Sequence, residues 1–143
     1  MEALEKVKAW LQTFPLWAQA PLHIDNTGAE PINCGLFPVG VEELGRKEDL
    51  LGNRQIDCRQ TFLLRRIAQR EEIAAGWLMA LQQWVQQQNA AGTAPRLGDV
   101  AEKCWVRAEK GRLSAANQTG TATYEIRIVF DYTEILEAEK ESL

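Results

Sequence analysis

The sequence predicts an α+β fold, in which two main helices pack on one face of an antiparallel or mixed β-sheet that ends in a long C-terminal β-hairpin. Segments 2–14 and 71–89 repeat their apolar residues with the 3.6-residue period of a helix. Segment 53–67 and the closing pair, 103–109 and 121–132, alternate apolar and polar residues as strands do. No internal repeat is present, and this order of elements is typical of a layered α+β domain.

The first element is an amphipathic helix that Pro15 ends. Its apolar residues share one side, and they are Ala3, Leu4, Val7, Trp10, Leu11 and Phe14. The next stretch, up to Gly40, is rich in proline and glycine, so we expect a long connection with only short extended pieces such as Leu22–Ile24. A weak alternation near 41–47 indicates one more strand.

A long strand with one buried face is predicted at 53–67. The apolar positions are Ile56, Cys58, Phe62 and Leu64, and the polar positions are Asp57, Arg59, Thr61 and Arg65. Gln60 interrupts the apolar face. The helix at 71–89 follows, with Gly92 and Pro95 in the order expected past a helix end. Its glutamine-rich face is either solvated surface or a subunit contact.

The last section predicts the hairpin. Val106 and Ala108 alternate with Trp105 and Arg107, and in the second strand Ala122, Tyr124, Ile126, Ile128, Phe130 and Tyr132 alternate with polar residues. The intervening segment 111–121 has too little apolar content to join the core. We therefore expect it to be a projecting end that is loose in an isolated subunit and becomes ordered against a neighbour.

Length and charge limit the function classes. The 143 residues fit one domain, taken as 1–133, followed by an acidic tail at 134–143. The net charge of −4 arises from residues 131–143 alone, so the rest is neutral, which argues against a general nucleic-acid binder. Apolar runs fall far short of the roughly 20 residues of a membrane helix. No secretory signal is visible, so a cytoplasmic protein is expected.

Few residues are suited to catalysis. The three cysteines lack paired spacing and are expected to be reduced and mostly buried. His23 is interpreted as a structural or surface imidazole, and neither Ser114 nor Ser142 lies in a nucleophile motif. The Asp-Asn-Thr-Gly at 25–28 is typical of a turn, and no glycine-rich phosphate loop occurs. No cofactor or metal is expected.

Arginines and tryptophans provide the candidate contact residues. Arg59 and Arg65 share a strand face that excludes Arg66, so they form a solvated or ion-paired surface, a subunit contact or, least favoured, a nucleic-acid contact. Trp105 lies on the polar side of its strand, where it is either packed under a loop or part of a protein contact. The subunit-interface candidates are Arg59, Arg65, Trp105, Arg107, Arg112, Asn117, Gln118 and Thr119.

Five segments resemble one family almost from end to end. They are LEKVKAWLQTFP, EPINCGLFPVG, RQTFLLRR, WLMALQQWVQQQNAAGTAPRLGD and GRLSAANQTGTATYEIRIVFDY. The family is that of the phage and prophage tail terminators, often labelled minor capsid proteins, at the head-to-tail junction. The helix and its glycine- and proline-containing exit are the most specific part. The sequence departs from many relatives at Cys104-Trp105 and in its charged tail.

The resemblance implies a structural protein without enzymatic activity. Such a protein assembles as a homo-oligomeric ring of six subunits on the last ring of the tail tube protein and stops tube polymerisation. Its other face meets a head-completion or connector protein, and DNA passes through the ring without specific binding. The implied location is the virion tail, after assembly in the bacterial cytoplasm. A connector or other minor capsid subunit is the alternative, and a small α+β enzyme is the least favoured one.

Overall fold

The chain folds around a single five-stranded sheet in the computed structural model, which describes residues 3–15, 22–24, 34–69, 74–100, 103–116 and 121–137. Its elements are α1 (Ala3–Leu11), β1 (Leu22–Ile24), β2 (Cys34–Glu48), β3 (Arg54–Gln69), α2 (Ala74–Ala91), β4 (Trp105–Ala116) and β5 (Thr121–Leu136). The strand order is β1-β2-β3-β5-β4, with β1 parallel to β2 and the other neighbours antiparallel. The predicted α+β class with a mixed sheet is confirmed.

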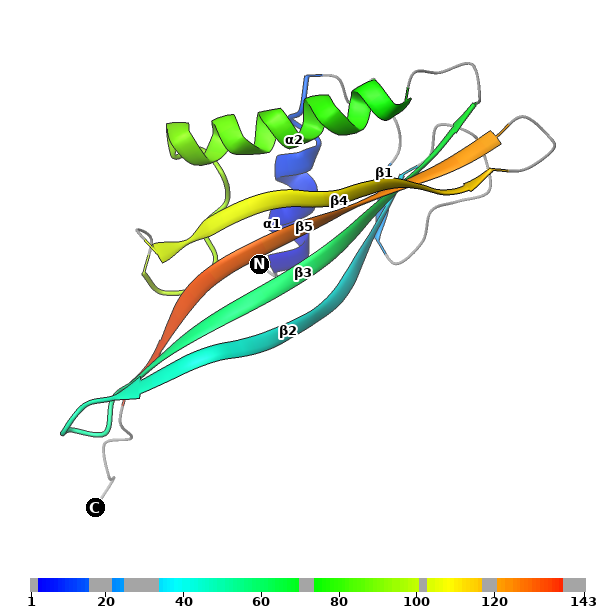
Figure 1. The fold of residues 1–143 in the computed structure, drawn as a ribbon. Coiled ribbons are helices and arrows are strands. Elements are labelled where there is room, and N and C mark those ends of the chain that lie inside the picture. The colour runs from blue at the N-terminus through cyan, green and yellow to red at the C-terminus, as the bar shows by residue number, and fades with distance from the viewer. Residues whose placement is uncertain are drawn as a thin grey trace.

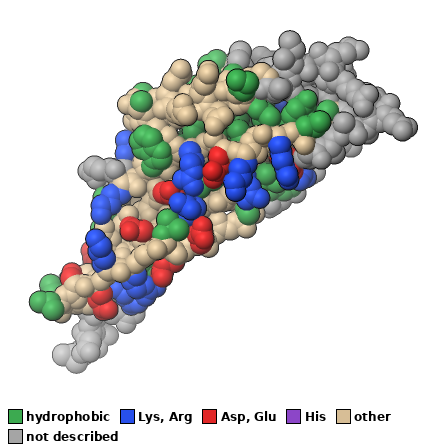
Figure 2. Space-filling model, viewed as in Figure 1, with side chains coloured by type: hydrophobic (Ala, Val, Ile, Leu, Met, Phe, Trp, Pro, Cys, Tyr) green, Lys and Arg blue, Asp and Glu red, His purple; other side chains and the backbone are tan. Residues whose placement is uncertain are grey.

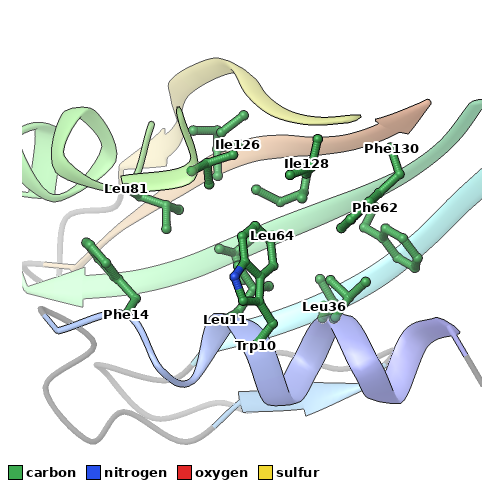
Figure 3. Close-up of a cluster of buried hydrophobic side chains, with 14 of the residues drawn as sticks. Trp10, Leu11, Phe14, Leu36, Phe62, Leu64, Leu81, Ile126, Ile128 and Phe130 are labelled. Carbon is green, nitrogen blue, oxygen red and sulfur yellow. The ribbon is translucent and has the colours of Figure 1, made fainter. Parts of the chain in front are cut away.

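Both helices lie on the same side of the twisted sheet, with α2 running along β4 (Figure 1). We call the helix-covered side of the sheet the inner face and the other side the open face. Trp10 and Leu11 from α1, Phe14 just after that helix and Leu81 from α2 point at the inner face in Figure 3. They meet Leu36, Phe62, Leu64, Ile126, Ile128 and Phe130 from the strands, all of them buried. The core therefore fills the space between helices and sheet.

Each helix ends in a way that its sequence explains. The first is shorter than predicted because residues after Leu11 form a turn, although Phe14 is still buried at 4% exposure. The second ends at Gly92, whose φ of 71° is left-handed. There the amide of Thr93 donates to the Gln88 carbonyl at 3.0 Å, and the Gly92 amide donates to Asn89 at 3.1 Å. This paired arrangement is the glycine-terminated cap expected from the sequence.

Strand β2 is much longer than the sequence indicated. The segment expected to be a connection up to Gly40 instead begins this strand at Cys34, so that prediction is wrong for 34–40. β1 covers β2 only at Cys34 to Leu36, and Pro38 lies beyond this cover, where a strand can lack an amide donor. Register shifts at Pro38/Gly40 and Glu43/Gly45 break the alternation that would have revealed the strand.

The strands β3 and β5 follow their predicted faces. Ile56, Cys58, Phe62 and Leu64 are all buried on the inner face, and half-buried Gln60 interrupts this face as expected. β5 continues to Leu136, paired with Arg54 of β3. Residues 134–136, taken from the sequence as the start of the acidic tail, are therefore strand residues of the sheet.

The C-terminal hairpin is formed by β4 and β5, which pair from Trp105↔Asp131 to Ala116↔Ala122. Residues 111–116, predicted to be loose, are strand residues paired with β5 in a single chain. Gly111 lies beside the core here, where a Cβ would make ordinary contact with Ile126 and Leu78 at 3.5 Å. Residues 117–120 lie outside the described part. The prediction that this segment is loose in an isolated subunit and becomes ordered against a neighbour therefore remains a prediction for these residues alone.

The outer edge of β4 is covered by a side chain of α2. The Asn89 amide donates to the Val106 carbonyl and its oxygen accepts the Val106 amide hydrogen, the latter at 3.0 Å. A side-chain amide thus takes the place of a neighbouring strand at this point. Within the described residues, neither helix has both the length and the apolarity of a membrane-crossing helix.

Candidate functional site

The open face of the sheet carries most of the candidate residues. Basic and acidic side chains alternate over the strands on the side of the molecule that Figure 2 shows. The arrangement comes from the strand period, which sends every second side chain of β3, β4 and β5 away from the core. Two rows of ion pairs cross the strands, and we name each after its central carboxylate.

The Asp131 row joins four strands. Arg59 of β3 holds Asp131 of β5 through two hydrogen bonds, from Nε to Oδ1 at 2.7 Å and from Nη2 to Oδ2 at 3.3 Å. Arg107 of β4 donates to Oδ2 at 2.9 Å from the other side. The row ends at Glu42 of β2, 3.8 Å from Arg59, and at Glu109 of β4, 3.4 Å from Arg107. A carboxylate between two guanidinium groups fixes the relative position of three strands.

The Glu125 row repeats this plan nearer the other end of the sheet. Arg65 donates from Nε and Nη2 to one carboxylate oxygen of Glu125, at 3.0 and 2.7 Å. Arg112 reaches the other oxygen at 3.4 Å. The Arg65 guanidinium also lies over the Phe37 ring, 5.0 Å from its centroid. Glu125 is buried although it lies on the open face, whereas Arg112 is largely exposed and has donors free for another molecule.

Two further residues of the open face are as buried as the core. Val129 and Thr133 are each only 2% exposed although they lie on the face without helices. The Thr133 hydroxyl donates to the Asp57 carboxylate at 2.8 Å. Long arginine stems can cover apolar neighbours while their charged ends stay in water. The open face is therefore a packed and ordered surface.

Asp131 has the clearest electrostatic signature on this face. Partial burial raises the pKa of its carboxyl, but the hydrogen bonds and charges of Arg59 and Arg107 outweigh burial and hold the pKa below its ordinary value. A carboxyl with a lowered folded pKa stabilises the protein above its unfolded pKa of about 3.9, and this stabilisation is lost as the pH falls through the folded value.

We expect Asp131→Asn to lower the free energy of unfolding at pH 7 by about 1 kcal/mol, because two arginines lose a charged partner. Denaturant unfolding at several pH values should show the difference from wild type shrinking below about pH 4, where the Asp131 carboxyl of the unfolded chain becomes protonated, and disappearing once the folded carboxyl is protonated as well. The control is Glu5→Gln on the exposed side of α1. A deficit that stays constant down to pH 2 would contradict the role assigned to the charge.

The structure describes five of the eight subunit-interface candidates. Trp105 lies on the open face beside Asp131 and is 56% exposed, so it is not packed under a loop. Arg59, Arg65, Arg107 and Arg112 all belong to the two rows. Asn117, Gln118 and Thr119 lie outside the described residues. Arg66 points inward as the alternation predicted, with its guanidinium 4.8 Å from the centroid of the Trp77 ring.

The two central carboxylates were missed as partners at the sequence level, because Asp131 and Glu125 lie 72 and 60 positions after Arg59 and Arg65. Not all of the acidic residues that precede Arg59 belong to the rows. Glu43 instead pairs with Arg46 at 2.6 Å, and Asp49 holds the β2–β3 turn by accepting the amides of Leu51 and Asn53. The alternation of β5 does place Glu125 and Asp131 on the polar side. The missing information was the strand order, which puts β5 beside β3.

Among the described residues, neither the thiols of Cys58 and Cys104 nor the hydroxyl of Tyr132 has a lowered pKa that would activate it as a nucleophile. All three cysteines are free, with Cys34 and Cys58 buried and Cys104 partly so, as predicted. Burial raises the pKa of the Cys58 and Cys104 thiols, which keeps them protonated, and burial raises the pKa of Tyr132 to about 12. Within the described ranges no group of three or more His, Cys, Asp or Glu could hold a metal ion. The imidazole of His23, in β1, lies outside the described part.

Comparison with protein-family models and with curated protein sequences finds no match for this chain.

Proposed function

We propose that this protein is a structural subunit of a phage, prophage or tail-like particle that assembles into a ring on the tail tube. The ring ends polymerisation of the tube protein and presents its other side to a head-completion or connector protein. The observation that carries the proposal is the broad open face, which is ordered by ion pairs and left uncovered by either helix. The resemblance in sequence supplies the kind of particle.

The open face suits contact with another protein. Its arginines and carboxylates are already fixed by one another, so little side-chain freedom remains to be lost on binding. The edge of the face adds Trp105, an exposed aromatic residue of the kind enriched at protein contacts. Arg112 extends from its shared carboxylate into solvent, with its side chain 72% exposed. We assign Trp105, Arg107 and Arg112 to the subunit contact.

A ring requires a second, different surface on each subunit, because head-to-tail contacts join unlike patches. The β2–β3 end of the sheet extends away from the helices (Figure 1). It carries Leu50 and Leu51, exposed at 106% and 79%, on a turn tied by Asp49 and Gly52. An apolar tip on a fixed turn is a suitable second surface, in addition to the C-terminal hairpin end.

Charge is compatible with DNA passing through such a ring. The two rows together hold four arginines and four carboxylates, and the chain has a net charge of −4. A lining without basic excess does not retain the phosphate backbone. The proposed DNA contact is therefore transit without specific binding.

Electron microscopy of the purified protein, alone and added to tail tubes, tests this function. We expect rings with a central opening wide enough for duplex DNA, formed in solution or at the tube end. A Trp105→Ala/Arg112→Ala variant should fold like wild type and form far fewer rings, while Met79→Ala, on the exposed side of α2, should leave ring formation unchanged. A protein that forms no ring and does not cap tubes would contradict the proposal.

Deletion of the gene from its phage separates the proposed function from the connector alternative. Loss of a terminator gives tails of abnormal length, or tails that fail to join heads. Labelling of particles from a head-defective background should place the protein on free tails. If the label appears only on heads and tail length is normal, the protein is a connector or another minor capsid subunit.

A further inference from the structure

The outer edge of β2 is a long strand edge without a described neighbour. β1 pairs with β2 only at Cys34, Gly35 and Leu36. From Pro38 to Glu48 every residue is exposed except half-buried Gly45, and Val39, Val41 and Leu44 are 52%, 58% and 47% exposed. Figure 1 shows this part of β2 as the outermost strand of the sheet. Such an edge offers a row of amide and carbonyl groups to another strand.

The charges along this edge are self-complementary in the antiparallel direction. Glu42 and Glu43 precede Leu44-Gly45, and Arg46 and Lys47 follow. A second copy of β2 running antiparallel therefore presents its basic pair to the acidic pair of the first. A two-fold axis makes both halves of such a contact identical, as in most homodimers.

The bulge in β2 makes this arrangement possible on both faces of the sheet. Glu43 lies opposite Cys58 and Gly45 opposite Asp57, so Leu44 is an extra residue relative to β3. Glu42 and Lys47 lie opposite Arg59 and Gln55 and so share the open face. Glu43 and Arg46 lie opposite Cys58 and Ile56 and share the inner face. In a regular strand, residues five apart would point to opposite faces.

The register of a self-pairing follows from these faces. With the axis between Leu44 and Gly45, Glu42 faces Lys47 of the second copy and Glu43 faces its Arg46, on matching faces. A shift that puts Leu44 opposite Leu44 sets Glu42 against Arg46, which point to opposite faces. A shift that puts Gly45 opposite Arg46 sets Glu43 against Glu48 and Glu42 against Asp49, which repel. Of these three registers, only the first brings opposite charges together on matching faces.

The side chains have capacity for these added contacts. Arg46 already binds Glu43 of its own strand at 2.6 Å, but its side chain is 47% exposed and a guanidinium has five N–H donors. Glu42 is 3.8 Å from Arg59, with 64% of its side chain exposed. Val41 would gain cover from the stem of Glu48 in the second copy. No side chain has to turn to another face.

We propose that two copies of this chain pair through the β2 edge, antiparallel and two-fold symmetric, with Glu42 opposite Lys47 and Glu43 opposite Arg46. The ten-strand sheet so formed covers the exposed strand edge. This contact takes only Glu42, from the end of the Asp131 row, and none of Trp105, Arg107 and Arg112, which are assigned to the ring contact. It is therefore separate from that contact and can hold in the free protein or between two rings.

Charge-swapped variants test the pairing by sedimentation or light scattering. Variant A is Glu42→Lys/Glu43→Lys, and variant B is Arg46→Glu/Lys47→Glu. We expect wild type to dimerise, and each variant alone to dimerise at least about tenfold more weakly, because like charges then face each other across the axis. An equimolar mixture of A and B should restore a heterodimer, since the basic edge of A meets the acidic edge of B.

The control Lys6→Glu/Lys103→Glu changes the net charge as variant B does, at exposed positions outside β2, and should dimerise like wild type. If a variant fails to fold, hydrogen exchange of wild type gives the answer: the amides of 39–48 should become protected as protein concentration rises. A wild type that stays monomeric, dimers unaffected by either swap, or a mixture that restores nothing would overturn the pairing. Rings that persist in both variants would leave the proposed function intact.

Discussion

Replacing Trp84 by alanine is expected to lower the free energy of unfolding by about 3–5 kcal/mol. The Trp84 ring on α2 stacks on Trp10 of α1 with centroids 4.9 Å apart and lies 5.2 Å from the Phe14 ring. Trp10 in turn meets Phe130 of the sheet at 6.0 Å. The substitution therefore leaves a cavity where both helices meet the sheet, and it removes two aromatic contacts that hold α1.

Urea unfolding followed by circular dichroism measures this effect, with Met79→Ala as the control. Met79 lies on the same helix but is 64% exposed, so its truncation should change stability by no more than about 0.5 kcal/mol. Trp84→Phe should lie between the two, because it keeps a ring against Trp10. If Trp84→Ala were as stable as Met79→Ala, the aromatic cluster would not be the main link between the helices.

Strand faces and helix faces could be predicted because they depend on local period alone. The predicted apolar faces of β3 and β5 both lie against the core in the described residues. Each of these segments has one side packed against the core and one side facing away from it. Apolar and polar residues therefore follow the period of the strand or helix. Alternation also separated Arg66 from the face of Arg59 and Arg65, and the Arg66 side chain is buried on the opposite face.

Contacts between distant strands could not be predicted in the same way. Asp131 and Arg59 are 72 positions apart, and only the order β3-β5-β4 puts a carboxylate between Arg59 and Arg107. The start of β2 was missed for a different reason. An edge strand tolerates Pro38, Gly40 and bulges because it has one described neighbour beyond Leu36, so its sequence resembles a loop.

The contact of the loop between α2 and β4 with the edge of the sheet could not be predicted from the sequence either. β4 begins at Trp105, opposite Asp131, so the last part of β5 has no strand on that side. The Asp99 amide donates to the Thr133 carbonyl at 2.8 Å, and the Asp99 carboxylate accepts the Ile135 amide at 2.7 Å. Asp99 alone thereby satisfies two backbone groups at the strand end that β4 leaves open.

Gly98 permits this contact, and we expect Gly98→Ala to lower the free energy of unfolding by about 2–4 kcal/mol. Its φ is 78°, and a Cβ would lie 2.5 Å from the Thr133 carbonyl oxygen and 2.8 Å from the Tyr132 ring. The backbone of β5 cannot withdraw without losing its pairing to β3. The loop must move instead, and both Asp99 hydrogen bonds are then lost.

Gly92→Ala separates the two causes of this loss. Gly92 has a similar φ of 71°, but a Cβ there would meet only the end of the flexible Arg96 side chain, at 3.4 Å. It should therefore lose about 1 kcal/mol, from the left-handed conformation alone. Hydrogen exchange should show the Ile135 amide exposed in Gly98→Ala and protected in Gly92→Ala. Equal stability of the two variants would mean that close approach to β5 adds nothing beyond backbone strain.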